Sequence, residues 1–152
     1  MTGVQTCALP ILLAGVVSDC AIEAAARGCS LVLQASGPVT ISGDPELLRR
    51  AVENVIRNAI RYAPQQTAVE VRLERAGSTV SVRVRDYGPG VPAEALDRIF
   101  DAFYRVDGDR NRGSGGVGLG LSIARRAVEL HKGTLRARNA TPGLLVEMEL
   151  PV

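Results

Sequence analysis

A cluster of glycines in front of a helical segment is the feature of this sequence best suited to chemistry. Five glycines fall within the eight residues 113–120, and the polar residues that follow recur at helical spacing up to Lys132. Glycines let a phosphate approach the backbone, and the free N–H groups of a helix N-terminus attract anions. The pattern predicts a phosphate-binding loop, and a simple glycine-rich entry into a helix is the alternative.

Two better-known glycine motifs fit this loop poorly. Residues 113–118 spell the dinucleotide-binding pattern Gly-x-Gly-x-x-Gly, but that pattern follows a strand, whereas residues 107–112 are polar and charged. A Walker loop needs Gly-Lys-Ser or Gly-Lys-Thr, and the loop contains no lysine.

A row of polar side chains marks the helix predicted for residues 45–63. On a helical wheel, Asn54, Asn58 and Arg61 form a stripe along one border of the apolar face, with Tyr62 beside them. Amide oxygens suit Mg²⁺, and a guanidinium binds phosphate oxygens. The row predicts a metal and phosphate site. Asparagines that are merely tolerated at the border are the alternative.

Asp86 interrupts an apolar face. Residues 79–85 alternate between apolar and polar, and the same period puts Asp86 on the apolar side. A buried ionised carboxylate is costly without hydrogen-bond donors. The sequence Tyr-Gly-Pro-Gly then breaks the strand at residues 87–90. We expect Asp86 to accept a hydrogen bond from a ligand such as an adenine amino group, with an ordinary Asp-x-Gly turn as the alternative.

Hydrophobic periodicity predicts the elements that position these residues. Helices are expected at residues 12–27 and 45–63 and after the glycine loop. Strands are expected at residues 31–34 and 39–41, read as a pair, and at residues 67–75, 79–85, 133–138 and 144–150.

Composition narrows the class of protein. A chain of 152 residues that is 46% hydrophobic forms one domain with a real core. A net charge of +2 and 3% aromatic residues argue against nucleic-acid binding. The three cysteines have no metal-binding spacing, and the lone histidine, His131, is expected to interact with carbonyls at a helix end rather than in catalysis.

Four motifs occur in order. They are Asn-x-x-x-Asn-Ala from Asn54, Asp-x-Gly-x-Gly from Asp86, Ile-Phe-x-x-Phe-Tyr-Arg from Ile99, and Gly-Gly-x-Gly-Leu-Gly-Leu-x-Ile from Gly115. The set resembles the ATP-binding domain of sensor histidine kinases, in the superfamily of gyrase, Hsp90 and MutL. The resemblance covers residues 12–152 and implies an α/β two-layer sandwich of the Bergerat type. In that fold, a mixed sheet of about five strands is covered on one face by three helices.

The resemblance also implies ATP and Mg²⁺ as cofactors and a role for each site residue. Asn58 would bind the metal, Asn54 would assist, and Arg61 would lie near the phosphates. Asp86 would accept from the adenine amino group. The other nucleotide-binding residues would be Tyr62, Gly88, Gly90, Phe100, Phe103, Arg105, Gly116, Val117, Gly118, Leu119 and Gly120, with residues 101–115 forming a lid. Tyr104 and Arg105 look most like the envelope-stress subgroup.

One departure from the wider superfamily, and one absence relative to a complete histidine kinase, shape the expected activity. Gyrase-type ATPases have a water-activating Glu where this chain has Asn54, and an amide cannot act as a base. The domain is therefore expected to hold ATP and donate its γ-phosphate. The acceptor would be a histidine on a dimerisation hairpin that this chain does not contain, with a response regulator downstream. A non-catalytic nucleotide-binding module and a gyrase- or MutL-type ATPase are the alternatives.

Residues 1–11 look foreign to the domain. They resemble the translation of a sequencing adapter, so we expect an artefact at residues 1–11 and the ATP-binding domain at residues 12–152 of an N-terminally truncated protein. The apolar stretch 9–17 is too short to be a membrane span. We expect a cytoplasmic monomer without membrane contact, from a parent kinase anchored in the bacterial inner membrane.

Overall fold

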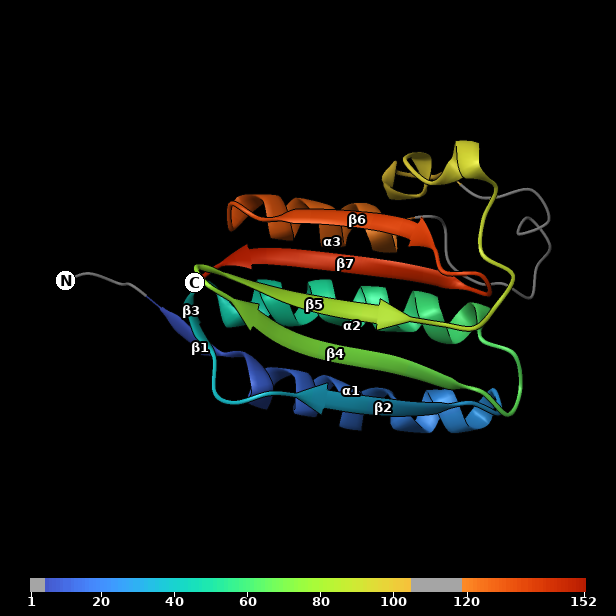
Figure 1. Cartoon of the computed structure of the whole chain (residues 1–152), viewed down its shortest axis with the longest axis horizontal. Coiled ribbons are helices and arrows are strands. Elements are labelled where there is room, and N and C mark those ends of the chain that lie inside the picture. The colour runs from blue at the N-terminus through green and yellow to red at the C-terminus, as the bar shows by residue number, and fades with distance from the viewer. Residues whose placement is uncertain (1–4, 105–118) are drawn as a thin grey trace.

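The chain folds into two layers, a five-stranded sheet and three helices that cover one of its faces (Figure 1). The computed structural model describes residues 5–104 and 119–152. The predicted α/β two-layer sandwich is confirmed. In chain order the elements are β1 (Thr6–Ala8), α1 (Leu9–Ala26), β2 (Ser30–Ala35), β3 (Thr40–Ser42), α2 (Pro45–Tyr62), β4 (Ala68–Ala76), β5 (Thr79–Arg85), the 3₁₀ turns η1 (Ala93–Ala95) and η2 (Arg98–Phe100), α3 (Gly120–Leu130), β6 (Thr134–Asn139) and β7 (Leu144–Pro151).

The main sheet is mixed, in the order β2-β4-β5-β7-β6. β2 runs parallel to β4, and the other neighbours are antiparallel. Since β5 pairs with β7, its last residue, Arg85, lies opposite Leu145, close to the turn between β6 and β7. Asp86 therefore leaves the sheet beside this turn. The pairing brings two segments together that are more than fifty residues apart in the sequence.

A second, two-stranded sheet was not expected. Segments 31–34 and 39–41 both form strands, but they do not pair with each other: β2 joins the main sheet, and β3 pairs with β1. β1 comes from the segment that looked foreign, and it contributes a buried Cys7, while Leu9 at the start of α1 is 1% exposed. These residues thus take part in the fold. Their origin in an adapter stays a prediction that the nucleotide sequence upstream of codon 12 tests.

Local signals explain where the helices begin and end. The carboxylate of Asp44 caps α2 by accepting from the N–H groups of Glu46 (2.9 Å) and Leu47 (3.4 Å). α1 begins at Leu9, three residues earlier than expected, and ends before Gly28, which has a φ of +81° suited to glycine. The strands β4, β5 and β7 bury alternate apolar residues against the helices, as their periodicity predicted.

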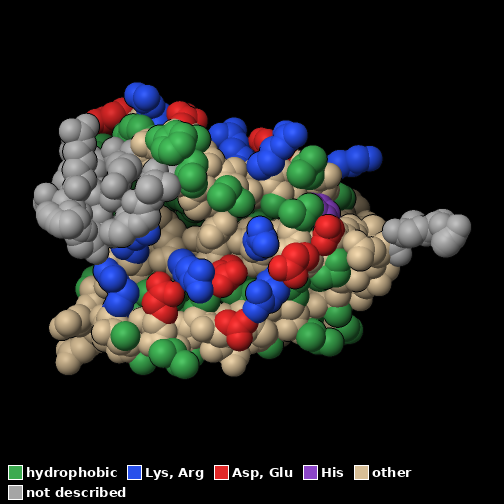
Figure 2. Space-filling model, turned by 180° about the vertical axis from the view of Figure 1, so that it is seen from behind, with side chains coloured by type: hydrophobic (Ala, Val, Ile, Leu, Met, Phe, Trp, Pro, Cys, Tyr) green, Lys and Arg blue, Asp and Glu red, His purple; other side chains and the backbone are tan. Residues whose placement is uncertain are grey.

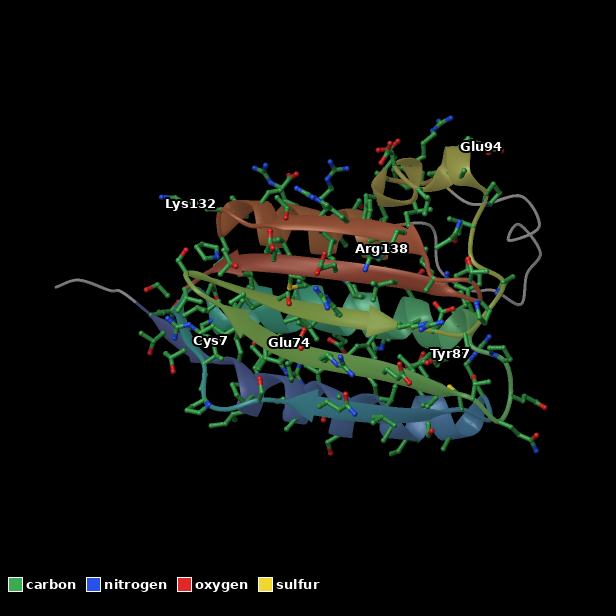
Figure 3. All side chains as sticks on the ribbon, in the orientation of Figure 1. Cys7, Glu74, Tyr87, Glu94, Lys132 and Arg138 are labelled. Carbon is green, nitrogen blue, oxygen red and sulfur yellow. The ribbon has the colours of Figure 1, made fainter. Side chains whose placement is uncertain are left out.

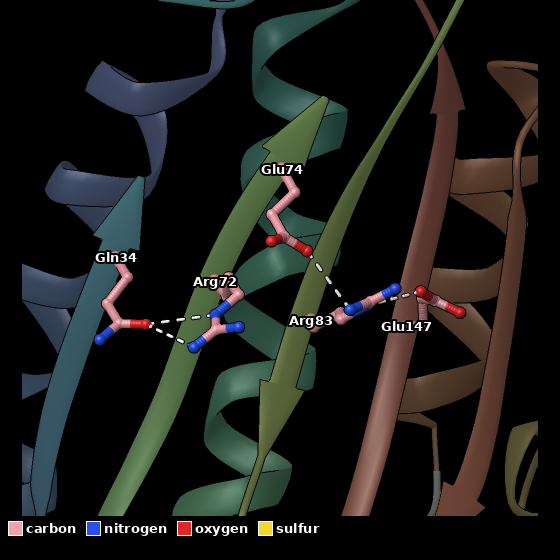
Figure 4. Close-up of polar contacts among 5 residues, drawn as sticks. All are labelled: Gln34, Arg72, Glu74, Arg83 and Glu147. Carbon is pink, nitrogen blue, oxygen red and sulfur yellow. Dashed lines mark hydrogen bonds and ion pairs between the residues drawn. The ribbon is translucent and has the colours of Figure 1, made fainter. Parts of the chain in front are cut away.

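Charged side chains of both signs occur on the two outer faces. On the uncovered face of the sheet, Arg83 bridges Glu74 at 3.3 Å and Glu147 at 2.7 Å, and Arg72 donates to Gln34 (Figure 4). On the helix face, acidic and basic side chains are interspersed (Figure 2). The core therefore lies between the layers, and both faces carry charged side chains of both signs.

α1 has the length and composition of a membrane-spanning helix. Its 18 residues have a mean hydropathy of 1.7, and 28% of them are buried. The buried side includes Leu13, Val16 and Cys20 and packs in the hydrophobic core.

Candidate functional site

α2 carries the predicted polar row. Asn54, Asn58, Arg61 and Tyr62 are all half-buried, whereas the apolar residues between them, such as Val55, are buried. The four residues therefore lie at the border between the core and solvent. This is where a helix can present polar groups to a ligand without losing its packing.

Asp86 is the only buried charged side chain in the described part of the chain, at 2% exposure. Its Oδ1 accepts a hydrogen bond from the Gly88 N–H at 2.8 Å. Burial raises the pKa of the Asp86 carboxyl, opposed by hydrogen bonds from the Gly88 and Leu144 N–H groups and by the charge of Arg85. The Asp-x-Gly turn is thus present, and the carboxylate lies in a partly desolvated position that a donor from a ligand would stabilise.

Gly88 joins this turn to α2. A Cβ placed on Gly88 would overlap the backbone carbonyl of Tyr62 and would lie 3.0 Å from Oδ1 of Asp86. Only a residue without a side chain allows this approach. The end of α2 and the turn after β5 are therefore in contact, which brings Tyr62 to Asp86.

The start of α3 approaches the same helix further toward its N-terminus. A Cβ at Gly120 would lie 3.9 Å from Oδ1 of Asn54. The free N–H groups at the beginning of this 11-residue helix therefore open beside the asparagine row. Three of the four sequence motifs thus meet along α2.

The two phenylalanines of the third motif differ. Phe100 is buried at 5% exposure, and the guanidinium of Arg125 lies 5.7 Å from its ring centroid. Phe103 is 69% exposed and has a φ of +66°, a conformation that side chains rarely adopt. Phe100 packs in the core, whereas Phe103 presents an apolar ring to solvent.

The rest of the predicted nucleotide contacts are only partly described. Leu119 is half-buried at the start of α3, where its carbonyl accepts from the Ser122 hydroxyl at 2.8 Å. Arg105, Gly116, Val117 and Gly118 lie outside the described residues.

Sequence reasoning missed the turn between β6 and β7. Its Gly143 packs against the backbone of Asp86, and Asn139 at the end of β6 bonds to the segment after Gly90. Figure 3 shows Tyr87 at this end of the sheet and Lys132 at the other end. The sequence predicts strands on both sides of residues 139–143, but nothing in the sequence of these residues identifies the segment that they contact.

His131 has a structural position, as expected. Its Nδ1 lies 2.7 Å from the Ala127 carbonyl, and its Nε2 accepts from the Asp44 N–H at 2.9 Å. The imidazole thus ties the end of α3 to the start of α2.

The candidate metal ligands on α2 are the amide oxygens of Asn54 and Asn58. No group of three or more His, Cys, Asp or Glu side chains that could hold an ion occurs among the residues that the structure describes. Asn54 offers a neutral oxygen beside the N-terminus of α3, and Asn58 lies one turn further along α2. Such a set suits Mg²⁺, which keeps several waters and binds substrate phosphates.

Comparison with known proteins identifies the family of the chain. Residues 43–152 match the family of histidine kinase-, DNA gyrase B- and HSP90-like ATPases. The chain is 40% identical to the sensor histidine kinase CpxA of Escherichia coli K12 over 129 residues, which is 84% of this chain and 28% of CpxA.

Solved structures show the same fold. The mycobacterial sensor histidine kinase MprB superposes with a TM-score of 0.85 at 26% identity, covering 97% of each chain. Full-length ShkA in complex with AMPPNP superposes with a TM-score of 0.84 at 27% identity, covering 99% of this chain and 31% of that one.

The chain belongs to the histidine kinase-, DNA gyrase B- and HSP90-like ATPase family, and within it to the catalytic domains of sensor histidine kinases. It spans less than a third of the length of CpxA. The resemblance inferred from the four motifs is confirmed.

Proposed function

We propose that this domain binds Mg-ATP between α2, the turn after β5 and the start of α3, and donates the γ-phosphate to a histidine on a helical hairpin of its parent kinase. The observation that carries this proposal is that two separate motifs approach the helix that carries a third: Gly88 approaches Tyr62, and Gly120 approaches Asn54. The ShkA structure, which contains AMPPNP, gives a related fold with an ATP analogue.

Asp86 is proposed to read the adenine base. Its carboxylate is buried at 2% exposure, so a hydrogen bond from the exocyclic amino group would meet little competition from water. Gly88 and Gly90 would let the base lie against the backbone, and Tyr62, Phe100 and Phe103 would bound the nucleotide. The support is the buried carboxylate and the close approach of Gly88 to α2.

Asn58 is proposed to ligate Mg²⁺, assisted by Asn54. The metal would neutralise charge on the transferred phosphoryl group when bound. Arg61, Arg105 and the backbone at residues 116–120 would hold the phosphates, aided by the positive end of α3. The amide donor set and the position of Asn54 beside Gly120 support this assignment.

The chemistry proposed is transfer rather than hydrolysis. An amide at residue 54 cannot take a proton from water, so the bound nucleotide would persist until an acceptor arrives. The bond between the γ-phosphorus and its bridging oxygen would break, a bond to an imidazole nitrogen would form, and ADP would leave. Positioning of the reacting groups and neutralisation of the phosphate charge would accelerate the transfer.

The partners follow from the family. The acceptor hairpin would belong to the parent kinase, and a response regulator would receive the phosphoryl group from it. The domain would act in the cytoplasm as a monomer, with the parent anchored in the bacterial inner membrane. CpxA, of which the chain matches 28%, supports a longer parent protein.

One experiment separates the alternatives. The domain is mixed with Mg²⁺ and γ-labelled ATP and with a phosphoacceptor hairpin from a related kinase, and label on the hairpin is followed alongside free phosphate. Transfer that requires Mg²⁺ and is lost in Asn58→Ala supports the proposal. ATP binding without transfer indicates a binding module. Steady hydrolysis that Asn54→Ala abolishes indicates a gyrase-type ATPase.

A further inference from the structure

The side chain of Asn139 pairs with both backbone polar groups of Val91. Its Nδ2 donates to the Val91 carbonyl at 2.7 Å, and its Oδ1 accepts from the Val91 N–H at 2.9 Å. The side-chain amide thus forms the pair of hydrogen bonds that the backbone of a neighbouring strand would form, although Val91 is not in a strand. Val91 is the first residue after the glycine turn that begins at Asp86.

The contact between Asn139 and Val91 requires a glycine at residue 90. Gly90 has a φ of +73°, and a Cβ there would lie 2.5 Å from Oδ1 of Asn139 and 3.2 Å from the Gly143 carbonyl. A side chain at residue 90 would push Asn139 away from Val91. The second glycine of the motif is therefore required by the turn between β6 and β7 as well as by its own conformation.

The other end of the segment is held by the same turn. The Asp86 N–H donates to the Leu144 carbonyl at 3.1 Å, and Arg85 Nη2 donates to the carbonyls of Pro142 at 3.1 Å and Ala140 at 3.3 Å. The backbone of Gly143 lies so close to the Asp86 carbonyl that a Cβ would overlap it. Residues 86 and 91 are therefore both tied to the turn between β6 and β7.

The bond from Gly88 to Asp86 transmits this restraint. The Gly88 N–H donates to the carboxylate oxygen Oδ1 at 2.8 Å, so the orientation of the carboxylate depends on where residue 88 lies. Residue 88 in turn lies midway between the two tied ends. Asn139 is exposed, which means that its amide contributes to local geometry more than to the hydrophobic core.

We infer that Asn139 is a positioning residue for base recognition: through Val91 it holds the glycine turn so that the Asp86 carboxylate faces the adenine amino group. The inference rests on the proposed function, in which Asp86 reads the base. It assigns a specificity role to the β6–β7 turn, which lies outside all four motifs.

The test compares ADP with inosine diphosphate, which has a carbonyl oxygen in place of the adenine amino group. Calorimetry on the full chain with Mg²⁺ gives both affinities for the wild type, Asn139→Ala and the control Thr134→Ala, an exposed polar residue at the other end of β6. Asn139→Ala is expected to weaken ADP by about three- to tenfold. Inosine diphosphate should change less, so the preference for ADP falls.

Amide hydrogen exchange tests the geometry without nucleotide. The Val91 amide should exchange faster in Asn139→Ala and remain protected in Asn139→Asp, which keeps the Oδ1 acceptor but loses the donor. Asn139→Asp has the same shape and should still lower the preference for ADP, which keeps the test valid if the alanine variant folds poorly.

Unchanged ADP affinity in Asn139→Ala, or equal losses for both nucleotides, would overturn the inference, because a merely structural residue would not alter base preference. A different result would contradict the proposed function itself. The wild type would then bind no ADP, or Asp86→Asn would leave the preference for ADP over inosine diphosphate unchanged.

Discussion

The backbone carbonyl of Tyr62 occupies the space that a side chain on Gly88 would need. Tyr62 lies at the end of α2 and Gly88 lies just after β5, in the second motif, and their contact forms one wall of the candidate nucleotide site. The space between them is fixed by the packing of α2 on the sheet.

Gly88→Ala should therefore damage the site directly. The added methyl group would force the turn or the end of α2 to move, at a cost of about 1–3 kcal/mol in the free energy of unfolding, together with a loss of ATP affinity. Gly15→Ala is a matched control, because an added Cβ there meets nothing within 4 Å in the interior of α1. That variant should be more stable by about 1 kcal/mol. Denaturant unfolding and calorimetry measure both, and wild-type ATP binding by Gly88→Ala would refute the contact.

Asp86→Asn should weaken nucleotide binding without lowering the stability of the fold at neutral pH. Because burial raises the pKa of this carboxyl above its ordinary value of 3.8, the folded state holds the proton more tightly than the unfolded state. The wild type should therefore lose stability as pH rises from about 4 through the raised pKa, and the variant should lack this loss. At neutral pH, the variant should be at least as stable as the wild type. Urea unfolding from pH 4 to 8 measures the difference.

The same variant should bind adenine nucleotides about tenfold or more weakly, since a hydrogen bond to a charged acceptor is replaced by one to an amide. Asp97→Asn is the control, because Asp97 is an exposed carboxylate that makes no side-chain capping bond. Equal affinity of the wild type and Asp86→Asn for ADP would contradict a base-reading role.

Asn58→Ala should remove the dependence of ATP binding on Mg²⁺ while the fold persists, because the side chain is only half-buried at the border of α2. We expect affinity for Mg-ATP to fall at least about tenfold, whereas affinity for metal-free ATP changes little. Calorimetry with and without Mg²⁺ measures both. Arg50→Ala, on the exposed side of the same helix, should behave as wild type. An unchanged effect of Mg²⁺ in Asn58→Ala would show that the metal ligand is elsewhere.

The segment 1–11 should contribute to stability whatever its origin. Leu9 is 1% exposed and Ile11 is 76% exposed, so the two residues provide an internal comparison. Leu9→Ala should lower the free energy of unfolding by about 2–5 kcal/mol, and Ile11→Ala should change it by less than about 0.5 kcal/mol. Chemical denaturation measures the two values, and similar small effects for both would show that the segment does not pack on the core.

The sequence by itself determined the faces of the elements. A period of two in β4 and β5 predicted which residues are buried and placed Asp86 on the apolar side, and a period near 3.6 placed Asn54, Asn58 and Arg61 at the border of α2. These predictions hold because burial of one side of a helix or strand is a local property, visible in neighbouring residues.

Only the tertiary structure decided which faces meet. Nothing in the sequence paired β1 with β3, set Gly88 against Tyr62 or joined Asn139 to Val91, because such contacts link segments 26 to 48 residues apart. They depend on how the helices and strands pack together, and periodicity shows that a side is buried without identifying its partner. The sequence therefore predicts the candidate site residues from their types and spacing, whereas the restraint on the glycine turn depends on the packing of the β6–β7 turn.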